Sequence, residues 1–525
     1  MKRLFTHALV ACLSIMTLAS CGGGFNVESL VPENSLMAVK CNFEDIYNKS
    51  LGDGSAASNA ILDELTKEVA DMEFPADIEA QIMKGLKNPV NAFGLDLTQP
   101  VVFSLTSDIR ATEANAYVAA AVSDYAAAKD FVNSLYALAV EDYEDYTRGG
   151  APEKSVIAEN VDFYYFGRPC DDVFACALSE QYVLLYFTSE SDKRNGVKAQ
   201  LDIETLIKQE KPCSASGFKE FAAAGNSVDI WVNAESAVSL AAAASNDMSL
   251  SMIKPFAKDL ALNAYLEFEK GKTTLGASII CSDELKELYE QYYAVPSAKY
   301  LELLPTKTAF VYNAAMNVEG LKETWNELKS NLMYGSYITS LEAMGINEEF
   351  IGGLPGTITL GAEVLDPDKL GNAIIAMECE ENCYNTLVAL IEAYGLIERD
   401  YNGYRVLDIA YVTYNKDKEA ALVMTPELWE DSNSGTSFNS VFSSSALASE
   451  VKNGGVGIDF TNMSEDVLDE LAEEFGRRYK ADDLLEFVTS IVLTYDKNEA
   501  KYVWNMGDQQ NTILQKLIQI TSDNI

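Results

Sequence analysis

Residues 30–39, Leu30-Val31-Pro32-Glu33-Asn34-Ser35-Leu36-Met37-Ala38-Val39, decide the fold, because a similar stretch returns past the midpoint of this 525-residue chain. The second stretch is residues 303–312, Leu303-Leu304-Pro305-Thr306-Lys307-Thr308-Ala309-Phe310-Val311-Tyr312. Each stretch places a proline turn before an apolar run that is typical of a strand. A short polar turn and the start of a helix follow, at 42–46 and at 317–321. The two stretches therefore predict a chain of two related halves.

The order of the later elements also repeats. In each half a strand leads into a helix, further strands rich in aromatic or apolar residues follow, and a hairpin and a helix close the half. The expected strands are 115–120, 161–166, 182–187 and 225–232 in the first half, and 372–377, 404–407, 420–424 and 454–460 in the second. The closing hairpins turn at Gly271 and at 496–498, and the last helix covers 512–520.

This order predicts an α+β fold with two tandem related domains, each with a mainly antiparallel sheet and packed helices. The expected bounds are 29–295 for the first domain and 300–525 for the second, and internal duplication explains their likeness. A coincidence of common strand–helix patterns is the alternative, because only two copies exist.

Local signals place two helices. Ser464 is a suitable N-cap, and acidic residues follow it in the first turn, where they suit the helix dipole. A second helix is expected over 56–72, because Ile61, Leu62, Leu65 and Val69 recur at helical spacing. The stretch Gly52-Asp53-Gly54-Ser55 lacks the third glycine of a phosphate-binding loop, so we interpret it as a loop that precedes this helix.

The N-terminus reads as a secretory signal over residues 1–20. Lys2 and Arg3 precede an apolar run from Ala8 to Leu18, and small residues follow. Leu18-Ala19-Ser20-Cys21 is similar to the lipobox of bacterial lipoproteins. That resemblance implies cleavage before Cys21, diacylglycerol on its sulfur and acylation of its new amino group. An ordinary secreted protein with a chance cysteine is the alternative.

Two or more acyl chains anchor a protein stably to a membrane, whereas a single chain does not. Residues 21–28 would then form a short glycine-rich tether between the lipid and the first domain. No later segment approaches the roughly 20 consecutive apolar residues that a transmembrane helix requires. The expected membrane contact is therefore the N-terminal lipid.

Charge and histidine content exclude several classes of function. The chain has 80 acidic against 39 basic residues, a net charge of −41, which repels phosphate backbones and argues against nucleic-acid binding. The single histidine, His7, lies in the signal, so the mature chain has none. This excludes Ser-His-Asp and Cys-His catalysis and zinc sites that use histidine ligands.

Nine cysteines are present, of which Cys12 leaves with the signal and Cys21 carries the lipid. An odd number remains and cannot all pair within one chain, so we expect mostly free, buried thiols. A small loop disulfide between Cys170 and Cys176 is the alternative for that pair. The remaining cysteines are Cys41, Cys170, Cys176, Cys213, Cys281, Cys379 and Cys383.

Short motifs that resemble catalytic or metal sites are better explained without chemistry. Ser251-Met252-Ile253-Lys254 matches the S-x-x-K pattern of penicillin-binding proteins, but Lys272-Thr273-Thr274 follows too closely and lacks the glycine of their K-T-G. Asp366-Pro367-Asp368 lacks the spaced acids of a calcium loop. Cys379 and Cys383 have three residues between them, where a redox pair has two. The sequence therefore predicts no catalytic residue, no metal site and no cofactor.

Acidic pairs are the remaining candidates for catalysis, because glycosidases work with two carboxylates across a cleft. Such pairs occur at 141–142, 144–145 and 171–172, and Tyr136, Tyr143 and Tyr146 beside the first could stack on a sugar. A solvated helix end is the better interpretation in so acidic a chain.

Several segments together resemble a family of Bacteroidota lipoproteins known only as a domain of unknown function. The segments are 30–35 with the strand that follows, the helix start at 42–51, and 225–232, which ends in Ile230-Trp231-Val232. The resemblance covers nearly the whole mature chain and brings no catalytic residues. Surface-exported lipoproteins of this phylum usually carry acids soon after the lipid cysteine, whereas the first acid here is Glu28. This favours the periplasmic face of the outer membrane.

The leading hypothesis is a lipid-anchored cell-envelope protein with a non-enzymatic interaction or scaffolding role. One alternative is a surface lipoprotein that binds glycans, for which the 27 tyrosines are the motivation. The other is a carboxylate-dependent hydrolase of an envelope or dietary polymer. An envelope protein and a glycan are thus both open as partners beside the membrane.

Overall fold

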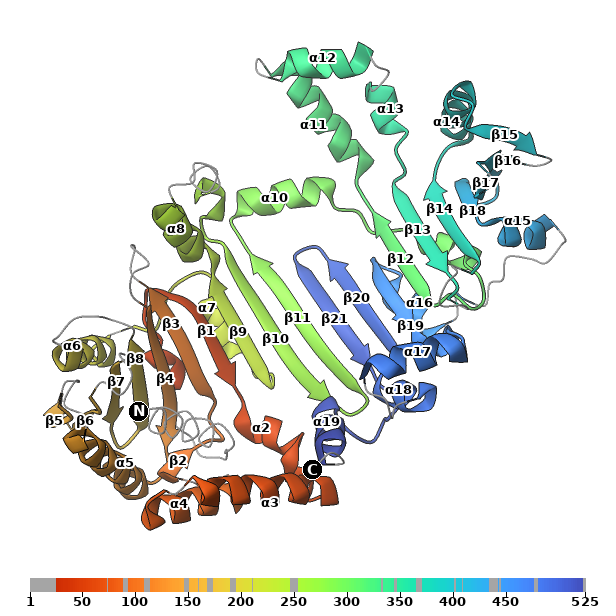
Figure 1. Ribbon diagram of the computed structural model, residues 1–525. Coiled ribbons are helices and arrows are strands. Elements are labelled where there is room, and N and C mark those ends of the chain that lie inside the picture. The colour runs from red at the N-terminus through yellow and green to blue at the C-terminus, as the bar shows by residue number, and fades with distance from the viewer. Residues whose placement is uncertain are drawn as a thin grey trace. The chain divides into compact units, whose positions relative to one another are not determined.

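A computed structural model shows the fold (Figure 1). The structure describes residues 25–72, 74–87, 93–107, 114–145, 151–158, 160–167, 173–188, 195–209, 211–245, 254–331, 334–343, 347–364, 371–400, 403–407, 409–433, 442, 445–475 and 480–522. The protein is α+β, as the sequence predicts, and its paired strands are antiparallel wherever a register is defined.

The chain forms two compact units whose boundaries interleave. Unit 1 comprises residues 1–270, 277–282 and 511–525, and unit 2 comprises 271–276 and 283–510. Residues 511–525 belong to unit 1, although they follow unit 2 in the sequence. The expected domain bounds of 29–295 and 300–525 stay a prediction.

Unit 1 has one antiparallel sheet. Along it the strands follow the order β5-β6-β7-β8-β4-β3-β1-β9-β10, and β2 pairs with one end of β4. The strands are β1 (Ser35–Cys41), β2 (Leu95–Asp96), β3 (Val101–Ser107), β4 (Ala114–Val122), β5 (Glu153–Ile157), β6 (Val161–Tyr165), β7 (Val173–Leu178), β8 (Tyr182–Thr188), β9 (Val228–Asn233) and β10 (Ala261–Glu269).

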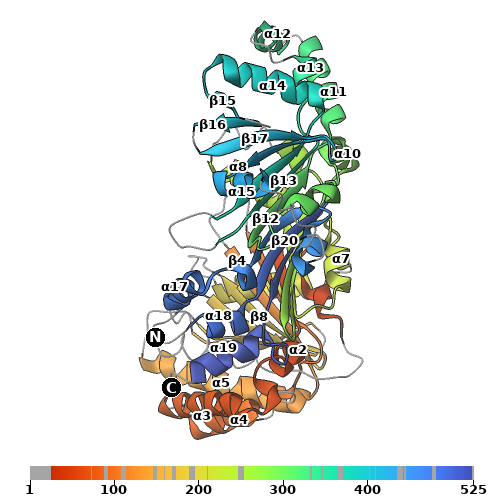
Figure 2. The same ribbon diagram turned by 90° about the vertical axis from the view of Figure 1, so that its right-hand side faces the viewer.

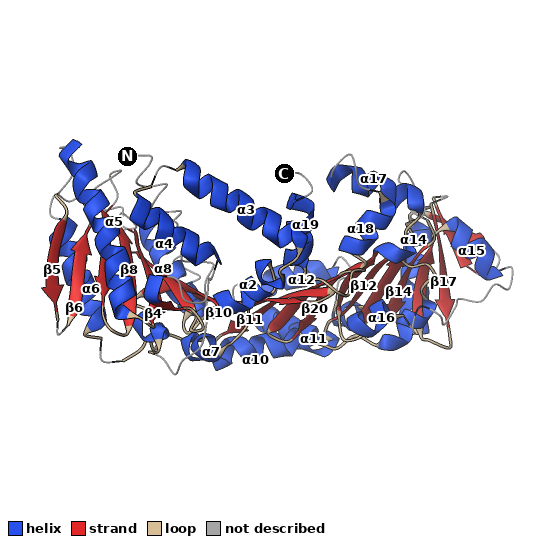
Figure 3. Cartoon of the chain, turned by 90° about the horizontal axis from the view of Figure 1, so that it is seen from below, coloured by secondary structure: helices blue, strands red, loops and turns tan. Residues whose placement is uncertain are grey.

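Two layers of helices cover this sheet, so the unit has a core on each face. Helices α6 and α7 pack on one face, and α3, α4 and α5 pack on the other; α4 and α7 lie on opposite sides in Figure 3. The helices are α2 (Phe43–Asn48), α3 (Ala56–Asp71), α4 (Ala76–Lys87), α5 (Tyr125–Asp145), α6 (Asn195–Ile207), α7 (Phe218–Ala223), α8 (Ala234–Ser245) and α19 (Ile513–Ser522), with 3-10 helices η1 (Val27–Leu30), η2 (Leu51–Asp53) and η4 (Lys254–Ala257).

Unit 2 has a sheet with the corresponding strand order, β15-β16-β17-β18-β14-β13-β12-β19-β20-β21. The strands are β12 (Phe310–Ala315), β13 (Thr357–Ala362), β14 (Ala373–Glu378), β15 (Ile397–Asp400), β16 (Gly403–Val406), β17 (Ala410–Asn415), β18 (Ala420–Met424), β19 (Gly455–Asp459), β20 (Ser490–Asp496) and β21 (Glu499–Asn505); β11 (Lys272–Ile280) has residues in both units.

The helices of unit 2 also lie on both faces of their sheet. The 3-10 helix η5 and helices α15 and α16 share one core, while α14, α17 and α18 contribute to the others. The helices are α10 (Asp283–Tyr292), α11 (Val318–Ser330), α12 (Gly335–Ala343), α13 (Glu348–Gly352), α14 (Glu381–Ala393), α15 (Pro426–Asn433), α16 (Ala446–Val451), α17 (Glu465–Phe475) and α18 (Ala481–Phe487), with η5 (Ala298–Leu303) and η7 (Phe460–Asn462).

The same position of the central strand holds a polar residue in both units. Lys40 and Asn313 each stand eight residues after the turn proline, Pro32 or Pro305. Lys40 Nζ donates to the carbonyls of Phe221 and Ala222, at 2.9 and 3.1 Å, and to that of Ala224, at the end of α7. Asn313 Nδ2 donates to the Val451 carbonyl, at 3.0 Å, at the end of α16. Each side chain thus donates to carbonyls at the C-terminal end of a helix.

Local predictions of helix starts and turns are confirmed. Ser55 accepts from the Ser58 amide at the start of α3, and Ser464 Oγ accepts from the Val467 amide at 3.4 Å before α17. The first hairpin turn has Gly271 at φ 73°, and the second pairs Asp496 with Glu499. The loop at 52–55 leads into α3, as the sequence predicts.

The last helix, α19, packs on α3 at the other end of the sequence of unit 1 (Figures 1 and 2). Thr512 donates from Oγ1 to the Lys49 carbonyl, and Gln515 Nε2 donates to Asp53 Oδ2 at 3.3 Å. These contacts tie the C-terminal segment to the loop before α3. Among the described residues, no helix combines the length and apolar character needed to cross a bilayer.

Candidate functional site

Several residues singled out from the sequence lie outside the described part of the chain. They include the predicted lipidation site Cys21, Cys170, the pair Asp171-Asp172, Ser251 and the segment 366–368. Glu141 is exposed on α5, and the side chains that follow it on that helix are likewise outside the described part. The geometry of a carboxylate pair therefore stays untested.

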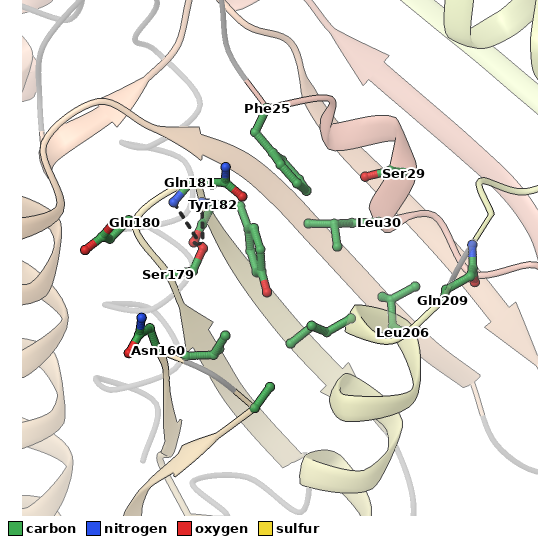
Figure 4. A pocket seen from close by; sticks show the side chains of 13 residues that line it. Phe25, Ser29, Leu30, Asn160, Ser179, Glu180, Gln181, Tyr182, Leu206 and Gln209 are labelled. Atoms are coloured by element: carbon green, nitrogen blue, oxygen red, sulfur yellow. Dashed lines mark hydrogen bonds between the residues drawn. The ribbon is translucent and has the colours of Figure 1, made fainter.

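A pocket of about 470 Å³ opens in unit 1 beside the first described residue (Figure 4). This volume falls within the range of about 300–1,000 Å³ typical of small-molecule sites. Four segments of the sequence form it: the N-terminal segment with η1, the β5–β6 turn, the β7–β8 turn, and the end of α6. Its larger apolar side chains are Phe25, Leu30, Val161, Tyr182, Leu206 and Ile207.

Tyr182, the first residue of β8, carries the polar group that faces this pocket. The side chain lies beside that of Leu30 in Figure 4, and its ring lies 5.1 Å from that of Phe25, tilted by 35°. Tyr182 is 5% exposed, and its hydroxyl oxygen has no hydrogen-bond partner among the described residues. A buried hydroxyl without a partner is costly, so this group points to a missing partner.

The polar part of the lining is almost free of charge. Among the described residues that line the pocket, Glu180 is the one with a charged side chain, and none is a lysine or an arginine. Ser179 accepts hydrogen bonds from the Gln181 and Tyr182 amides, at 3.1 and 3.0 Å, and so orders the β7–β8 turn. The pocket therefore suits an uncharged ligand better than an anion.

Unit 2 has a cluster of four tyrosines, which we call the tyrosine cluster: Tyr289, Tyr293, Tyr312 and Tyr495. The rings of Tyr289 and Tyr293 stack at 5.7 Å, and Tyr293 donates to Asp496 Oδ1 at 2.9 Å. Burial, and then the neighbouring Tyr312, Tyr293 and Tyr289, raises the pKa of Tyr495 to about 12.

Two members of the tyrosine cluster are open to solvent: Tyr289 is 41% exposed and Tyr312 36%. Exposed aromatic rings beside a carboxylate are suited to stacking on a ligand that also offers hydroxyl donors. This cluster was not predicted, because the tyrosines that the sequence places beside acidic pairs are different ones. The four-residue spacing of Tyr289, on α10, and Tyr293, directly after that helix, is the signal that was available.

Ser227 and Lys49 of unit 1 are arranged like a serine nucleophile and its base, with Lys49 Nζ 3.2 Å from Ser227 Oγ. Burial lowers the pKa of Lys49, but hydrogen bonds and charges from Asp45 and Glu267 outweigh it and raise that pKa above its usual value. Ser227 is fully buried and donates its hydroxyl to Asp45. A charged lysine and a buried hydroxyl already in use cannot start acyl transfer.

Burial raises the pKa of three of the described thiols, Cys41, Cys213 and Cys379. Burial, and then the charge of Asp229, raises the pKa of Cys41 to about 11. Burial and the neighbouring Cys383 thiol raise the pKa of Cys379, and Cys383 donates to the Gly353 carbonyl at 3.0 Å. Reactive cysteines require a lowered pKa instead. Cys41, Cys213, Cys281, Cys379 and Cys383 are free thiols, as the sequence predicts.

Across the described residues, no group of three or more cysteine, histidine, aspartate or glutamate side chains is arranged to hold a metal ion. The pocket and the tyrosine cluster are therefore the candidate sites that the described part offers. Neither was predicted, since each joins segments far apart in the sequence.

Comparisons with known proteins identify no family. No protein-family model matches the chain, and no curated protein matches it either. One solved structure, described as "Structure of crystal form III of TP0453", aligns with 51% of this chain and 87% of its own at 10% identity and a TM-score of 0.24. A TM-score that low supports no conclusion about fold or function.

Proposed function

We propose that the mature chain is a cell-envelope protein, anchored by lipid on Cys21, with a non-enzymatic interaction or scaffolding role. The lipobox-like stretch Leu18-Ala19-Ser20-Cys21 is the observation that carries this proposal. The arrangement of Ser227 and Lys49 supports the non-enzymatic part, because the best-placed nucleophile is buried beside a charged lysine.

The proposed location is the periplasmic face of the outer membrane. Glu28, the first acidic residue after Cys21, supports this orientation, since the residue is 9% exposed and its carboxylate lies 3.6 Å from buried Lys40. An acid engaged in the core is not available as an exposed sorting signal. The strong negative charge of the chain would hold the body away from anionic lipid head groups.

We also propose that the protein has two tandem related domains that arose by duplication. The shared strand order supports this, and so does the shared capping role of Lys40 and Asn313. Strand order alone recurs among unrelated α+β folds. A side chain at the same strand position that caps the corresponding helix in each unit is a more specific likeness. Such a duplication would give a scaffold protein two interaction surfaces on one membrane anchor.

The Cys21→Ala variant tests the anchor. We expect the unaltered protein to sediment with membranes and enter the detergent phase in Triton X-114 partitioning, and nearly all of the variant to stay in the aqueous phase, because the lipid would be the membrane contact. Cys41→Ala is the matched control and should partition like the unaltered protein. An unaltered protein that lacks acyl groups in intact-mass spectra, or that buffer washes from the membrane, contradicts the proposal.

Glycan binding is the second candidate function, and the tyrosine cluster favours it. We expect Tyr312→Ala and Tyr289→Ala each to weaken binding of an envelope or dietary glycan about tenfold, as removal of an aromatic anchor does at other interfaces. The measurement is a glycan array followed by calorimetry with the best ligand. Tyr337→Ala, on α12 and 71% exposed, is the control and should leave affinity unchanged. Equal losses in all three variants, or an array without binders, count against this function.

A further inference from the structure

We propose that the unit 1 pocket holds an uncharged acyl chain whose ester or amide carbonyl accepts a hydrogen bond from the Tyr182 hydroxyl. The apolar wall formed by Phe25, Leu30, Leu206 and Ile207 would surround the hydrocarbon. The hydroxyl is the one group in this lining that is both buried and without a partner among the described residues. A carbonyl acceptor would supply the hydrogen bond that the hydroxyl lacks.

The charge of the lining decides which acyl compounds fit. A free fatty acid or a phospholipid brings an anionic head group, and the lining offers it Glu180 and no lysine or arginine among the described residues. Burying an anion without a cationic partner is strongly unfavourable. Esters of glycerol and N-acyl amides carry the same hydrocarbon with a neutral carbonyl, so they are the class that this pocket suits.

The place where the described chain begins identifies a source for such a group. Phe25 lines the pocket, and four residue steps separate it from Cys21, a span of at most about 14 Å when extended. The diacylglyceryl and N-acyl groups proposed for Cys21 are neutral and carry ester and amide carbonyls. One of these chains can therefore reach the pocket, and this part of the inference rests on the proposed lipid anchor. A free monoacylglycerol is the other source of the same chemistry.

Binding of 1-monomyristoyl glycerol to the mature chain carrying Cys21→Ser tests the pocket without its own lipid. We expect saturable binding in calorimetry, at least tenfold weaker binding of myristate, and 3- to 10-fold weaker binding of the neutral probe to Tyr182→Phe, the loss typical of one hydrogen bond. Ile207→Trp, which adds bulk to the apolar wall, should abolish binding.

Tyr186→Phe is the matched control, because Tyr186 lies on the same strand and its hydroxyl already donates to Asp202 Oδ2 at 2.8 Å. It should lower the melting temperature and leave probe affinity unchanged. Tyr182→Phe should show the opposite pattern, with an equal or higher melting temperature in the absence of probe. No saturable binding, or unchanged affinity in Tyr182→Phe, overturns the inference.

The lipidated protein distinguishes the two sources. If an acyl chain of Cys21 fills the pocket, the lipidated protein should bind the probe at least tenfold more weakly than the Cys21→Ser protein. Equal affinity overturns the self-lipid assignment and supports a free acylglycerol. An unmodified N-terminus in mass spectra would instead refute the proposed anchor, while probe binding by the Cys21→Ser protein would stand.

Discussion

The Lys40→Met variant should lose about 3–5 kcal/mol of unfolding free energy, because it removes the cation from a buried set of acceptors. Lys40 is 4% exposed, and its Nζ lies 3.6 Å from Glu28 and 3.8 Å from Asp229. It also donates to three carbonyls at the end of α7. Methionine matches the length of the stem but leaves two carboxylates and these carbonyls without the charge that they face.

Urea unfolding can be assigned to unit 1 in this experiment. Of the four tryptophans, Trp231 lies in unit 1 and the other three lie in unit 2, so the ¹⁹F signal of 5-fluorotryptophan at position 231 reports on unit 1 alone. Lys67→Met is the control, because the Lys67–Glu64 pair is exposed and such pairs contribute about 0–1 kcal/mol. A loss below about 1 kcal/mol in Lys40→Met would show that the core tolerates unpaired carboxylates there.

The burial of Lys40 is a feature that could not be predicted from the sequence. The run Leu36-Met37-Ala38-Val39 correctly predicts a strand, yet a lysine at its end looks like a solvated strand terminus. Its burial depends on α7, which lies more than 170 residues further along the chain. Helix caps and hairpin turns, by contrast, depend on neighbouring residues, which is why Ser464 and Gly271 were predicted correctly.

The same limit applies to the sites. The pocket joins segments around Phe25, Asn160, Tyr182 and Leu206, and each is an ordinary strand or helix end when read alone. The C-terminal helix was predicted from the repeated order of elements, but that order did not identify its partner α3, which stands at the other end of the sequence of unit 1. Periodicity indicates which face of an element is apolar, and it does not identify the element that covers that face.

Trp231→Ala should destabilise unit 1 by about 3–5 kcal/mol, the range for removing a large aromatic side chain from a core. Trp231 is fully buried, and its ring meets that of Phe218 edge-on, at 5.2 Å and 82°. Its Nε1 donates to the Ser216 carbonyl at 2.9 Å, so alanine also removes the partner of that carbonyl. Loss of both the packing and the hydrogen bond places the expected effect in the upper part of the range.

The corresponding position of unit 2 is filled by a different side chain. Trp231 pairs with Ala38 on the central strand, and at the corresponding pair Gly457 faces Val311. There Leu447 of α16 occupies the space, since a Cβ at Gly457 would lie 2.4 Å from Leu447 Cδ1. In unit 1 the indole packs against Phe218 of α7, so its removal leaves a cavity between that helix and the sheet.

Circular dichroism in urea measures the loss, and Trp231→Phe is the comparison that separates packing from the rest. Phenylalanine keeps most of the ring contacts and lacks the Nε1 donor, so we expect it to lose roughly half as much stability as alanine. If the alanine variant lost no more unfolding free energy than the phenylalanine variant, α7 would have to pack directly on the sheet without the indole. The Lys40 hydrogen bonds would then have to adapt as well, because they join the same helix to the same sheet.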